Sequence, residues 1–197
     1  MLEYLLILLG VTLFGLQHSG ISSHRVKNRI IDRWGKEVYS RVFSATSIIT
    51  LLIAFLAMDF WDWLYPLTSF STYNLLQLLL ACLLIAGGLI LSVKASSVIS
   101  VSTVADMRSD RMPELVTDGI YAKIRHPLYL ATIMLLIGLA LLYPFIEVAV
   151  FSFGLIAYTL IGSYFEERKL ILHYGDEYLK YRKTVGFILP RLRRNSS

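Results

Sequence analysis

The fold is decided by residues 128–165, whose sequence is LYLATIMLLIGLALLYPFIEVAVFSFGLIAYTLIGSYF. Pro144 stands between two apolar segments, which together contain one charged residue, Glu147. Proline has no backbone N–H and clashes with the preceding helical turn, so it ends a helix rather than continuing it. We therefore predict a hairpin of two antiparallel helices, 128–143 and 145–165. In such a hairpin the start of the first helix lies beside the end of the second.

Three further apolar segments precede the hairpin, at about residues 2–17, 43–63 and 74–93. The last of them offers 20 residues without a charge. A helix of that length rises roughly 30 Å, the thickness of the hydrocarbon core of a membrane. The sequence therefore predicts an all-α fold, a polytopic membrane helix bundle with about five transmembrane helices. We expect residues 1–197 to form a single integral membrane domain.

The composition agrees with a membrane protein. The chain is 56% hydrophobic and only 17% charged, whereas soluble domains are roughly 45–50% apolar even with glycine counted. The single cysteine, Cys82, excludes an internal disulfide and a cluster of cysteine metal ligands. The histidines His18, His24 and His126 lack the spacing of a metal site, so no metal is predicted.

The basic residues predict the topology. All 19 lysines and arginines fall in three segments, 18–42, 94–127 and 166–197, which five alternating helices would place on one side of the membrane. With ten of the 14 acidic residues included, that side carries about +9 and the opposite side −4. The positive-inside rule then predicts an outside N-terminus and a cytoplasmic C-terminus. Basic residues spread over membrane-flanking segments, with no recognisable nucleic-acid fold, favour membrane lipids and exclude nucleic acid as the partner.

Two polar groups meet at the cytoplasmic end of the predicted hairpin. Arg125, His126 and Pro127 precede its first helix, and Glu166 and Glu167 follow its second. Pro127 suits a first helical turn, where free N–H groups and the helix dipole attract a carboxylate. Arg125 adds a guanidinium for the same anion, and the glutamates accept hydrogen bonds from sugar hydroxyls or an ammonium. This arrangement favours a zwitterionic cofactor that carries a ribose.

Simpler explanations exist for each group taken alone. Arg125 is also explained as a charge that marks the membrane boundary. The pair Glu166-Glu167 is also explained by neutralisation from Arg168 and Lys169. Acidic side chains at the C-terminal end of a helix oppose its dipole, however, so their position calls for a further reason.

The same residues belong to two longer motifs. The first is Leu115-Val116-x-x-Gly119-Ile120-Tyr121-x-x-x-Arg125-His126-Pro127-x-Tyr129, and the second is Glu166-Glu167 followed by Leu170, Gly175, Tyr178, Tyr181 and Pro190. With both motifs at matching separation, the chain closely resembles the isoprenylcysteine carboxyl methyltransferase family of integral membrane methyltransferases. The resemblance covers roughly residues 80–190.

This resemblance implies S-adenosyl-L-methionine as the methyl donor, with S-adenosyl-L-homocysteine as product, held at the cytosolic face. It assigns cofactor binding to Leu115, Val116, Gly119, Tyr121, His126, Tyr129 and Glu167. It assigns Arg125 and Glu166 to the catalytic wall of the site. Eukaryotic members commonly carry a basic residue where this chain has Thr184, so Arg182 or Lys183 is expected to substitute.

The first polar segment carries a second resemblance. Gln17-His18-Ser19, followed by Tyr39 and Phe43-Ser44, is similar to the NnrU-type and methanethiol S-methyltransferase branch of related membrane proteins. His18 either faces the same cytoplasmic side as the site or simply fixes the end of the first helix.

Taken together, these patterns predict a membrane-embedded methyltransferase for a lipophilic or small membrane-delivered acceptor, a carboxylate or a thiol. A carboxylate acceptor needs no base, whereas a thiol or amine needs one, and Glu166, His18 or a tyrosine is the candidate. The alternatives are a phospholipid or amine methyltransferase of the same fold and a non-enzymatic NnrU-like protein or transporter. The predicted spans contain few polar residues, which argues against a transporter.

Overall fold

The computed structural model describes residues 2–98 and 115–191, apart from the side chain of His24. Within these ranges the chain is helical and contains no β-strand. The long helices are α1 (Leu2–Ser22), α3 (Lys36–Leu56), α5 (Leu75–Val98), α7 (Pro127–Leu142) and α8 (Ile146–Tyr174). The short ones are α2 (His24–Trp34), α4 (Tyr65–Thr68), η1 (Phe70–Thr72), η2 (Gly119–Ala122) and α9 (Asp176–Thr184). The predicted polar segment 94–127 is thus described only at its two ends, and the segment 166–197 only as far as residue 191.

Four of the described helices, α1, α3, α5 and α8, are long and apolar enough to cross a membrane. Helix α7 is also apolar but has 16 residues, which rise only about 24 Å. The predicted all-α, polytopic helix bundle is confirmed. The protein is a multi-pass membrane protein.

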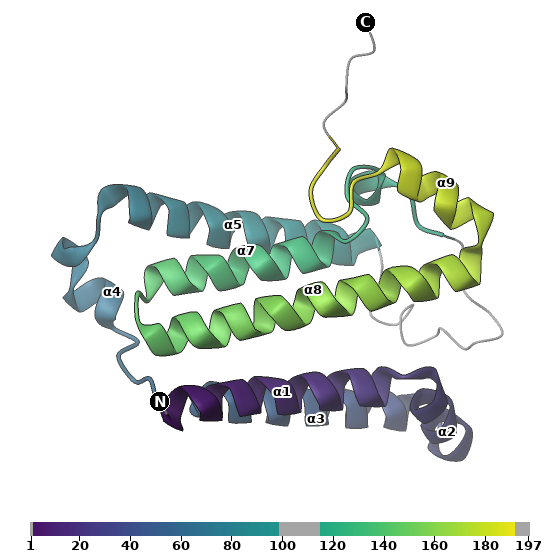
Figure 1. Ribbon diagram of the computed structural model, residues 1–197, viewed down its shortest axis with the longest axis horizontal. Coiled ribbons are helices and arrows are strands. Elements are labelled where there is room, and N and C mark those ends of the chain that lie inside the picture. The colour runs from purple at the N-terminus through teal and green to yellow at the C-terminus, as the bar shows by residue number, and fades with distance from the viewer. Residues whose placement is uncertain (1, 99–114, 192–197) are drawn as a thin grey trace, which may run out of the picture.

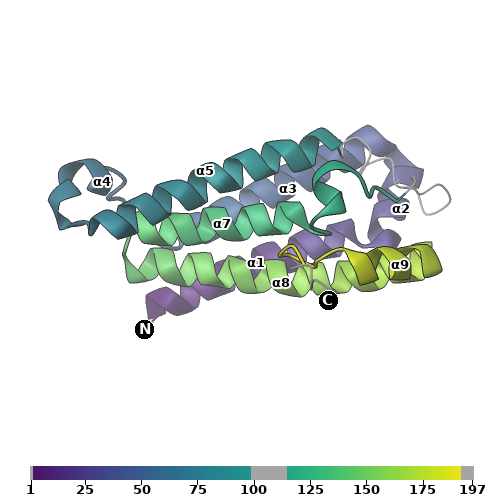
Figure 2. The same ribbon diagram turned by 90° about the horizontal axis from the view of Figure 1, so that it is seen from above.

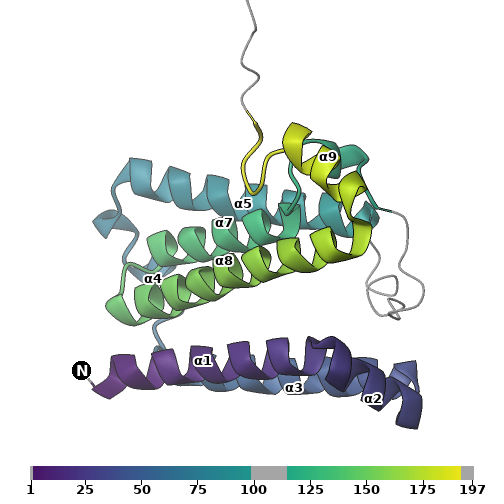
Figure 3. The ribbon, with the colours of Figure 1, turned by 45° about the vertical axis from the view of Figure 1, so that its right-hand side comes forward.

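The helices form two layers. Figures 1 and 3 show α1 and α3 side by side in one layer and α5, α7 and α8 in the other, with α8 facing α1. In the view from above, α9 lies along the far end of α8 (Figure 2). Helices α2 and α9 and the turn η2 all lie at one end of the bundle, while α4 and the α7–α8 turn lie at the other (Figure 1). The described parts of the three basic segments therefore share one end, as the charge pattern predicts.

The hydrophobic core joins the two layers near the end that holds α4. It consists of buried side chains from α1, from α3 and the loop after it, and from α7 and α8: Ile7, Val11, Ala54, Met58, Phe60, Leu136, Val148, Phe151 and Leu155. The opposite end, where α9 and η2 lie, contains buried polar side chains, among them His126 and Glu167, whose contacts are described below.

Close packing within each layer depends on glycine. A Cβ at Gly10 of α1 would lie 2.8 Å from the Cα of Ala54 in α3. A Cβ at Gly138 of α7 would lie 2.7 Å from Cγ1 of Ile85 in α5. Because the two glycines have no side chain, the partner helix approaches closely at each point, which is the usual way in which membrane helices associate.

The hairpin predicted around Pro144 is present, but several helix boundaries differ from the prediction. The second span, predicted at 43–63, runs from Lys36 to Leu56, so its basic residues form the first turns of the helix. It ends early because the chain leaves the helix before Asp59, which has φ of 49°. The first and third spans extend to Ser22 and Val98, past the predicted ends at 17 and 93.

The largest difference concerns the last span, which was predicted to end at residue 165. Helix α8 continues to Tyr174, where Gly175 with φ of 54° ends it. Glu166 and Glu167 therefore lie inside a helix, and the expected conflict with a C-terminal dipole is wrong. Hydropathy locates the point where a helix leaves the hydrocarbon, whereas backbone hydrogen bonding continues into the charged sequence beyond it.

Candidate functional site

The segment that enters α7 is fixed to the C-terminal tail by backbone pairing. The N–H of Arg125 donates to the carbonyl oxygen of Gly186 at 2.9 Å, and the N–H of His126 donates to that of Phe187 at 3.1 Å. Ile124 and Gly186 form a parallel β-bridge at the same place. Two segments more than 50 residues apart in the sequence thus set the positions of Arg125 and His126 together.

Glu167 lies at the centre of this junction, and its carboxylate contacts the polar side-chain atoms of four residues. Its Oε1 accepts from Nε of Arg125 at 2.7 Å and from the hydroxyl of Tyr178 at 2.6 Å. It also lies 3.2 Å from Nε2 of His126. Its Oε2 accepts from Nη2 of Arg125 at 3.1 Å and lies 3.4 Å from Nε of Arg182. We call these five residues the Glu167 cluster.

The guanidinium of Arg125 is fully engaged within this cluster. Nε and Nη2 form a two-point contact with Glu167, and Nη1 donates to the carbonyl oxygens of Arg182 and Val185. The two charged side chains are only 7% and 8% exposed. A buried pair of this kind is held in one geometry, because separating its members would leave an uncompensated charge away from water. Arg125 therefore positions α8 and the tail, and its fork has no free edge for an external anion.

His126 has a defined tautomer for the same reason. A buried carboxylate only accepts hydrogen bonds, so the ring nitrogen that faces Glu167, Nε2, carries the proton. The other nitrogen, Nδ1, lies 3.9 Å from Oε2 of Glu166. The ring contacts Phe187 edge to face, at 5.0 Å between centroids. Packing and hydrogen bonding thus direct Nδ1 toward Glu166.

Glu166 is the accessible acid of the pair. Its side chain is 44% exposed, against 8% for Glu167. The hydroxyl of Tyr129, in the first turn of α7, donates to its Oε2. Its Oε1 makes no hydrogen bond with any residue that the structure describes. One carboxylate oxygen is therefore oriented by α7 while the other is available for a ligand.

The tyrosines around the junction remain protonated well above neutral pH. Burial raises the pKa of Tyr121 to about 12, with a further contribution from the charge of Glu166. Burial also raises the pKa of Tyr181 to about 12, although Arg125 opposes the shift. Burial and the hydrogen bond to Glu167 raise the pKa of Tyr178. All three are donors at neutral pH, and the hydroxyl of Tyr181 donates to the carbonyl oxygen of Tyr121 at 2.6 Å.

Five of the nine predicted site residues come together here: Arg125, His126, Tyr129, Glu166 and Glu167. Tyr121 is buried in η2 and joins them through the electrostatic influence of Glu166 and the hydrogen bond from Tyr181. Gly119 opens η2 with φ of 59°, a conformation that side chains rarely adopt. Leu115 and Val116 are partly buried in the irregular segment before η2.

Sequence reasoning missed the part that the tail plays in the cluster. Tyr178 belongs to a helical stripe with Tyr174 and Tyr181, a pattern that usually means packing. Its hydroxyl instead donates to a buried carboxylate. Arg182, which was expected to substitute for the basic residue absent at Thr184, does reach the cluster, with Nε 3.4 Å from Glu167.

Comparison with known proteins shows which proteins this chain is similar to. A methanethiol S-methyltransferase of Pseudomonas deceptionensis is 37% identical over 81 residues, which are 40% of this chain and 29% of that protein. A protein-S-isoprenylcysteine O-methyltransferase of Schizosaccharomyces pombe is 38% identical over 77 residues, 39% of this chain and 33% of that protein. The chain thus matches about a third of the length of these two relatives.

A longer match is found to a methanethiol S-methyltransferase of Crocosphaera subtropica, which is 24% identical over 96% of this chain and 74% of its own length. No solved structure gives a significant match. Residues 76–177, from the start of α5 into α9, match the family described as phospholipid methyltransferase. Since this match covers just over half of the chain, the protein belongs to the phospholipid methyltransferase family of membrane methyltransferases.

Proposed function

We propose that the protein is an S-adenosyl-L-methionine-dependent methyltransferase that acts on a lipophilic or small membrane-delivered acceptor. The observation that carries this proposal is the pairing of an accessible carboxylate, Glu166, with the N-terminus of α7, both fixed by the buried Glu167 cluster. A cofactor that carries a carboxylate, an ammonium and ribose hydroxyls presents complementary groups to these two features.

The residues present fit such a cofactor. The first intrahelical bond of α7 runs from the N–H of Leu130 to the carbonyl oxygen of His126, so the N–H groups of Leu128 and Tyr129 lie before the hydrogen-bonded part of the helix. These donors and the helix dipole favour a carboxylate. Oε1 of Glu166 and Nδ1 of His126 accept hydrogen bonds from an ammonium or from hydroxyls. When bound, the cofactor supplies a methyl group on a positively charged sulfonium.

The other predicted residues take different roles in this proposal. Leu115, Val116, Gly119 and Tyr121 line the side of the site formed by η2 and the segment before it. Arg125 and Glu167 act as positioning residues, because their polar atoms are already paired with each other and with the tail. Glu166 is the residue closest to the chemistry.

We further propose that this end of the bundle faces the cytoplasm. The lysines and arginines among the described residues lie in segments at that end, and cytoplasmic loops of membrane proteins carry the excess of these residues. The C-terminus is then cytoplasmic, the N-terminus is outside, and the site opens toward the compartment that supplies a water-soluble cofactor.

The decisive experiment measures, by calorimetry, the binding of S-adenosyl-L-homocysteine to the purified protein in detergent. The Glu166→Gln variant should bind at least tenfold more weakly, a difference of about 1.4 kcal/mol. The matched control is Glu177→Gln, since Glu177 is an exposed acid of the neighbouring α9, and it should bind like the wild type. Absence of binding by the wild type at millimolar ligand overturns the proposal.

A second candidate acceptor is the amine of a phospholipid headgroup, which the description of the matched family favours. Labelled methyl donor offered with phospholipid vesicles, a carboxylate-bearing prenylated peptide and a small thiol separates these acceptors. The labelled product identifies the class.

A further inference from the structure

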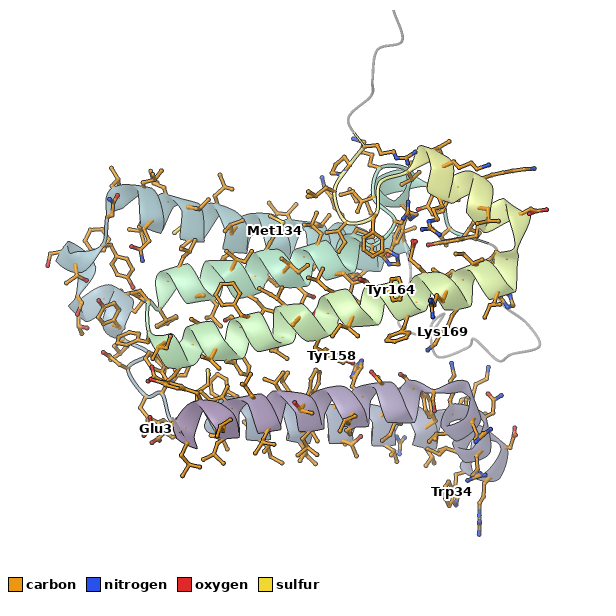
Figure 4. All side chains as sticks on the ribbon, viewed as in Figure 1. Glu3, Trp34, Met134, Tyr158, Tyr164 and Lys169 are labelled. Atoms are coloured by element: carbon orange, nitrogen blue, oxygen red, sulfur yellow. The ribbon has the colours of Figure 1, made fainter. Side chains whose placement is uncertain are left out.

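A second group of polar and aromatic side chains lies between the two layers, away from the Glu167 cluster. His18, near the end of α1, places Nδ1 3.1 Å from the hydroxyl of Ser47 in α3. Its ring lies 4.8 Å from that of Phe43, 5.3 Å from that of Phe14 and 6.4 Å from that of Tyr158, between centroids. We call these five residues the His18 cluster, and Figure 4 shows Tyr158 on the side of α8 that faces α1.

The imidazole of His18 has one nitrogen without a protein partner. Nδ1 is used by Ser47, whereas Nε2 makes no hydrogen bond with any residue in ranges 2–98 and 115–191. Among the described residues, the only buried polar side-chain atom without a partner is Oγ of Ser152. Nε2 of His18 is therefore not sealed inside the protein, and it can receive a hydrogen bond from a small molecule.

The His18 cluster and Glu166 lie along one side of α8. Tyr158, Gly162 and Glu166 are spaced four residues apart, so they occupy the same face over two helical turns, about 12 Å. Helix α1 packs tightly on Tyr158, because a Cβ at Gly15 would lie 2.8 Å from its ring. At Gly162 the opposite holds, since a Cβ there would meet no atom within 4 Å. The face of α8 between Tyr158 and Glu166 is thus open at Gly162.

From these contacts we infer that the methyl acceptor binds between α1, α3 and α8, beside Gly162, and that Nε2 of His18 takes its proton. The inference rests on the proposed function and adds the acceptor side of the same site. No charged side chain belongs to the His18 cluster, so it offers neither a cation for a carboxylate acceptor nor an anion for an ammonium. It fits a small neutral thiol, since sulfur packs favourably against aromatic rings and its weakly acidic proton needs an acceptor.

The sequence matches also separate α1 and α3, which hold most of the His18 cluster, from the rest of the chain. The family match begins at residue 76 and so leaves out α1 and α3. The match to the methanethiol S-methyltransferase of Crocosphaera subtropica covers 96% of the chain and so includes most of both helices. The part of the chain outside the family match is the part that holds His18, Phe43 and Ser47.

The chemical step assigned to His18 is a proton transfer. With Nδ1–H donating to Ser47, Nε2 carries a lone pair. As the acceptor reacts, its S–H bond breaks, an N–H bond forms at Nε2, and the electron pair of the broken bond stays on sulfur as the nucleophile. The imidazolium then releases its proton to water. Tyr158 of α8 is the titratable group that faces the ring directly, and Tyr39 of α3 lies one ring beyond, stacked on Phe43 with Lys27 over it.

The test compares His18→Gln with the wild type, using ethanethiol as the acceptor probe. Methyl transfer to ethanethiol should fall about a hundredfold or more, the usual contribution of a general base. Binding of S-adenosyl-L-homocysteine should stay within twofold of the wild type, so loss of the base is distinguishable from failure of the proposed function. The rate of the variant should keep rising with pH as free thiolate accumulates, whereas the wild type should level off at lower pH.

Two further measurements test the inference with other variants, in case His18→Gln does not fold. Ser47→Ala keeps the imidazole but removes its hydrogen bond, and it should lower the transfer rate several-fold with the same cofactor affinity. In the second measurement, calorimetry gives the affinity for ethanethiol of protein saturated with S-adenosyl-L-homocysteine. Gly162→Leu should lower this affinity at least tenfold relative to the wild type, and Gly162→Ala should lower it far less. Wild-type rates and pH profile in His18→Gln, or methylation of a carboxylate probe in preference to ethanethiol, overturn the inference.

Discussion

The Glu167 cluster and the His18 cluster are both built around one ionisable side chain, but they differ in how fully its polar atoms are paired. Both oxygens of Glu167 are paired, by Arg125, His126, Tyr178 and Arg182. Among the residues that the structure describes, His18 has a single polar contact, to Ser47, and otherwise lies among aromatic rings. A fully paired charge holds structure together, whereas a partly paired nitrogen retains capacity for a ligand.

The same difference separates two adjacent acids. Glu166 and Glu167 are neighbours in the sequence, yet successive residues of a helix point about 100° apart. Glu167 therefore enters the junction between α8 and the tail, whereas Glu166 faces outward with one oxygen that no described residue pairs. Sequence proximity alone gives both the same role, and helix geometry gives them different ones.

The largest expected effect comes from removing the centre of the paired cluster. Glu167→Ala should lower the free energy of unfolding by about 3–5 kcal/mol, because it leaves Arg125 buried without a counter-charge. Thermal unfolding in detergent measures it. The control is Glu37→Ala, whose partner Arg41 and own side chain are 81% and 87% exposed, and it should leave stability nearly unchanged. Equal melting temperatures for the two variants would show that the cluster is not structural.

A somewhat smaller effect is expected in the other layer. Gly10→Val should destabilise the protein by about 1–3 kcal/mol, because its side chain would overlap the backbone of Ala54 and push α3 away from α1. The displacement carries Ser47 away from His18, so transfer to ethanethiol should fall while binding of S-adenosyl-L-homocysteine stays. Gly20→Ala, in the same helix with open space around it, is the control. Parallel loss of cofactor binding would mean that the two layers do not act separately.

Tyr178→Phe removes one donor from Glu167 and leaves the rest of the cluster. A hydrogen bond to a charged acceptor contributes about 1.5–3 kcal/mol, and we expect a loss near the lower end because Arg125 and His126 still neutralise the carboxylate. Chemical or thermal unfolding in detergent measures the difference. Tyr164→Phe, on the exposed side of α8, should show no such loss.

The smallest effect is a dependence of stability on alkaline pH. In the folded protein the pKa values of Tyr121 and Tyr181 are raised from 10.0 to about 12. The unfolded chain therefore loses these protons first, so stability is full below pH 10 and declines as the pH rises from 10 toward 12. Melting temperatures across this range should fall less steeply for Tyr181→Phe than for the wild type. A slope identical to that of the wild type would exclude Tyr181 as a contributor.

Much of the fold follows from the sequence, because in a membrane the distribution of charge and apolar length leaves few choices. The run from Asn74 to Val93 and the hairpin at Pro144 required no knowledge of tertiary contacts. The helix ends were less accessible, since Lys36 and Tyr174 lie in charged sequence where hydropathy carries no information about backbone hydrogen bonding. Helix α2 was missed for the same reason.

The sequence predicts where the candidate site lies better than it predicts the hydrogen bonds among its residues. The hairpin argument brings Arg125 and His126 near Glu166 and Glu167, and the structure has them together. In the structure the tail folds back, so that Gly186 and Phe187 pair with Arg125 and His126. No local sequence pattern predicts this pairing. Contacts between segments so far apart along the chain depend on the folded path of the backbone, and so the engagement of Arg125 could not be foreseen.

The length of α8 determines the depth of Glu166, the residue placed at the centre of the proposed methyl transfer. Its 29 residues rise about 43 Å, roughly 13 Å more than the hydrocarbon of a bilayer. That surplus is the length of the stretch from Glu166 to Tyr174, so a helix that fills the hydrocarbon from its start emerges at Glu166. Tyr158 and Gly162 then lie at lipid depth, and Glu166 lies among the headgroups. A reactant dissolved in the bilayer and one dissolved in water can thus meet on one helix without either leaving its own phase.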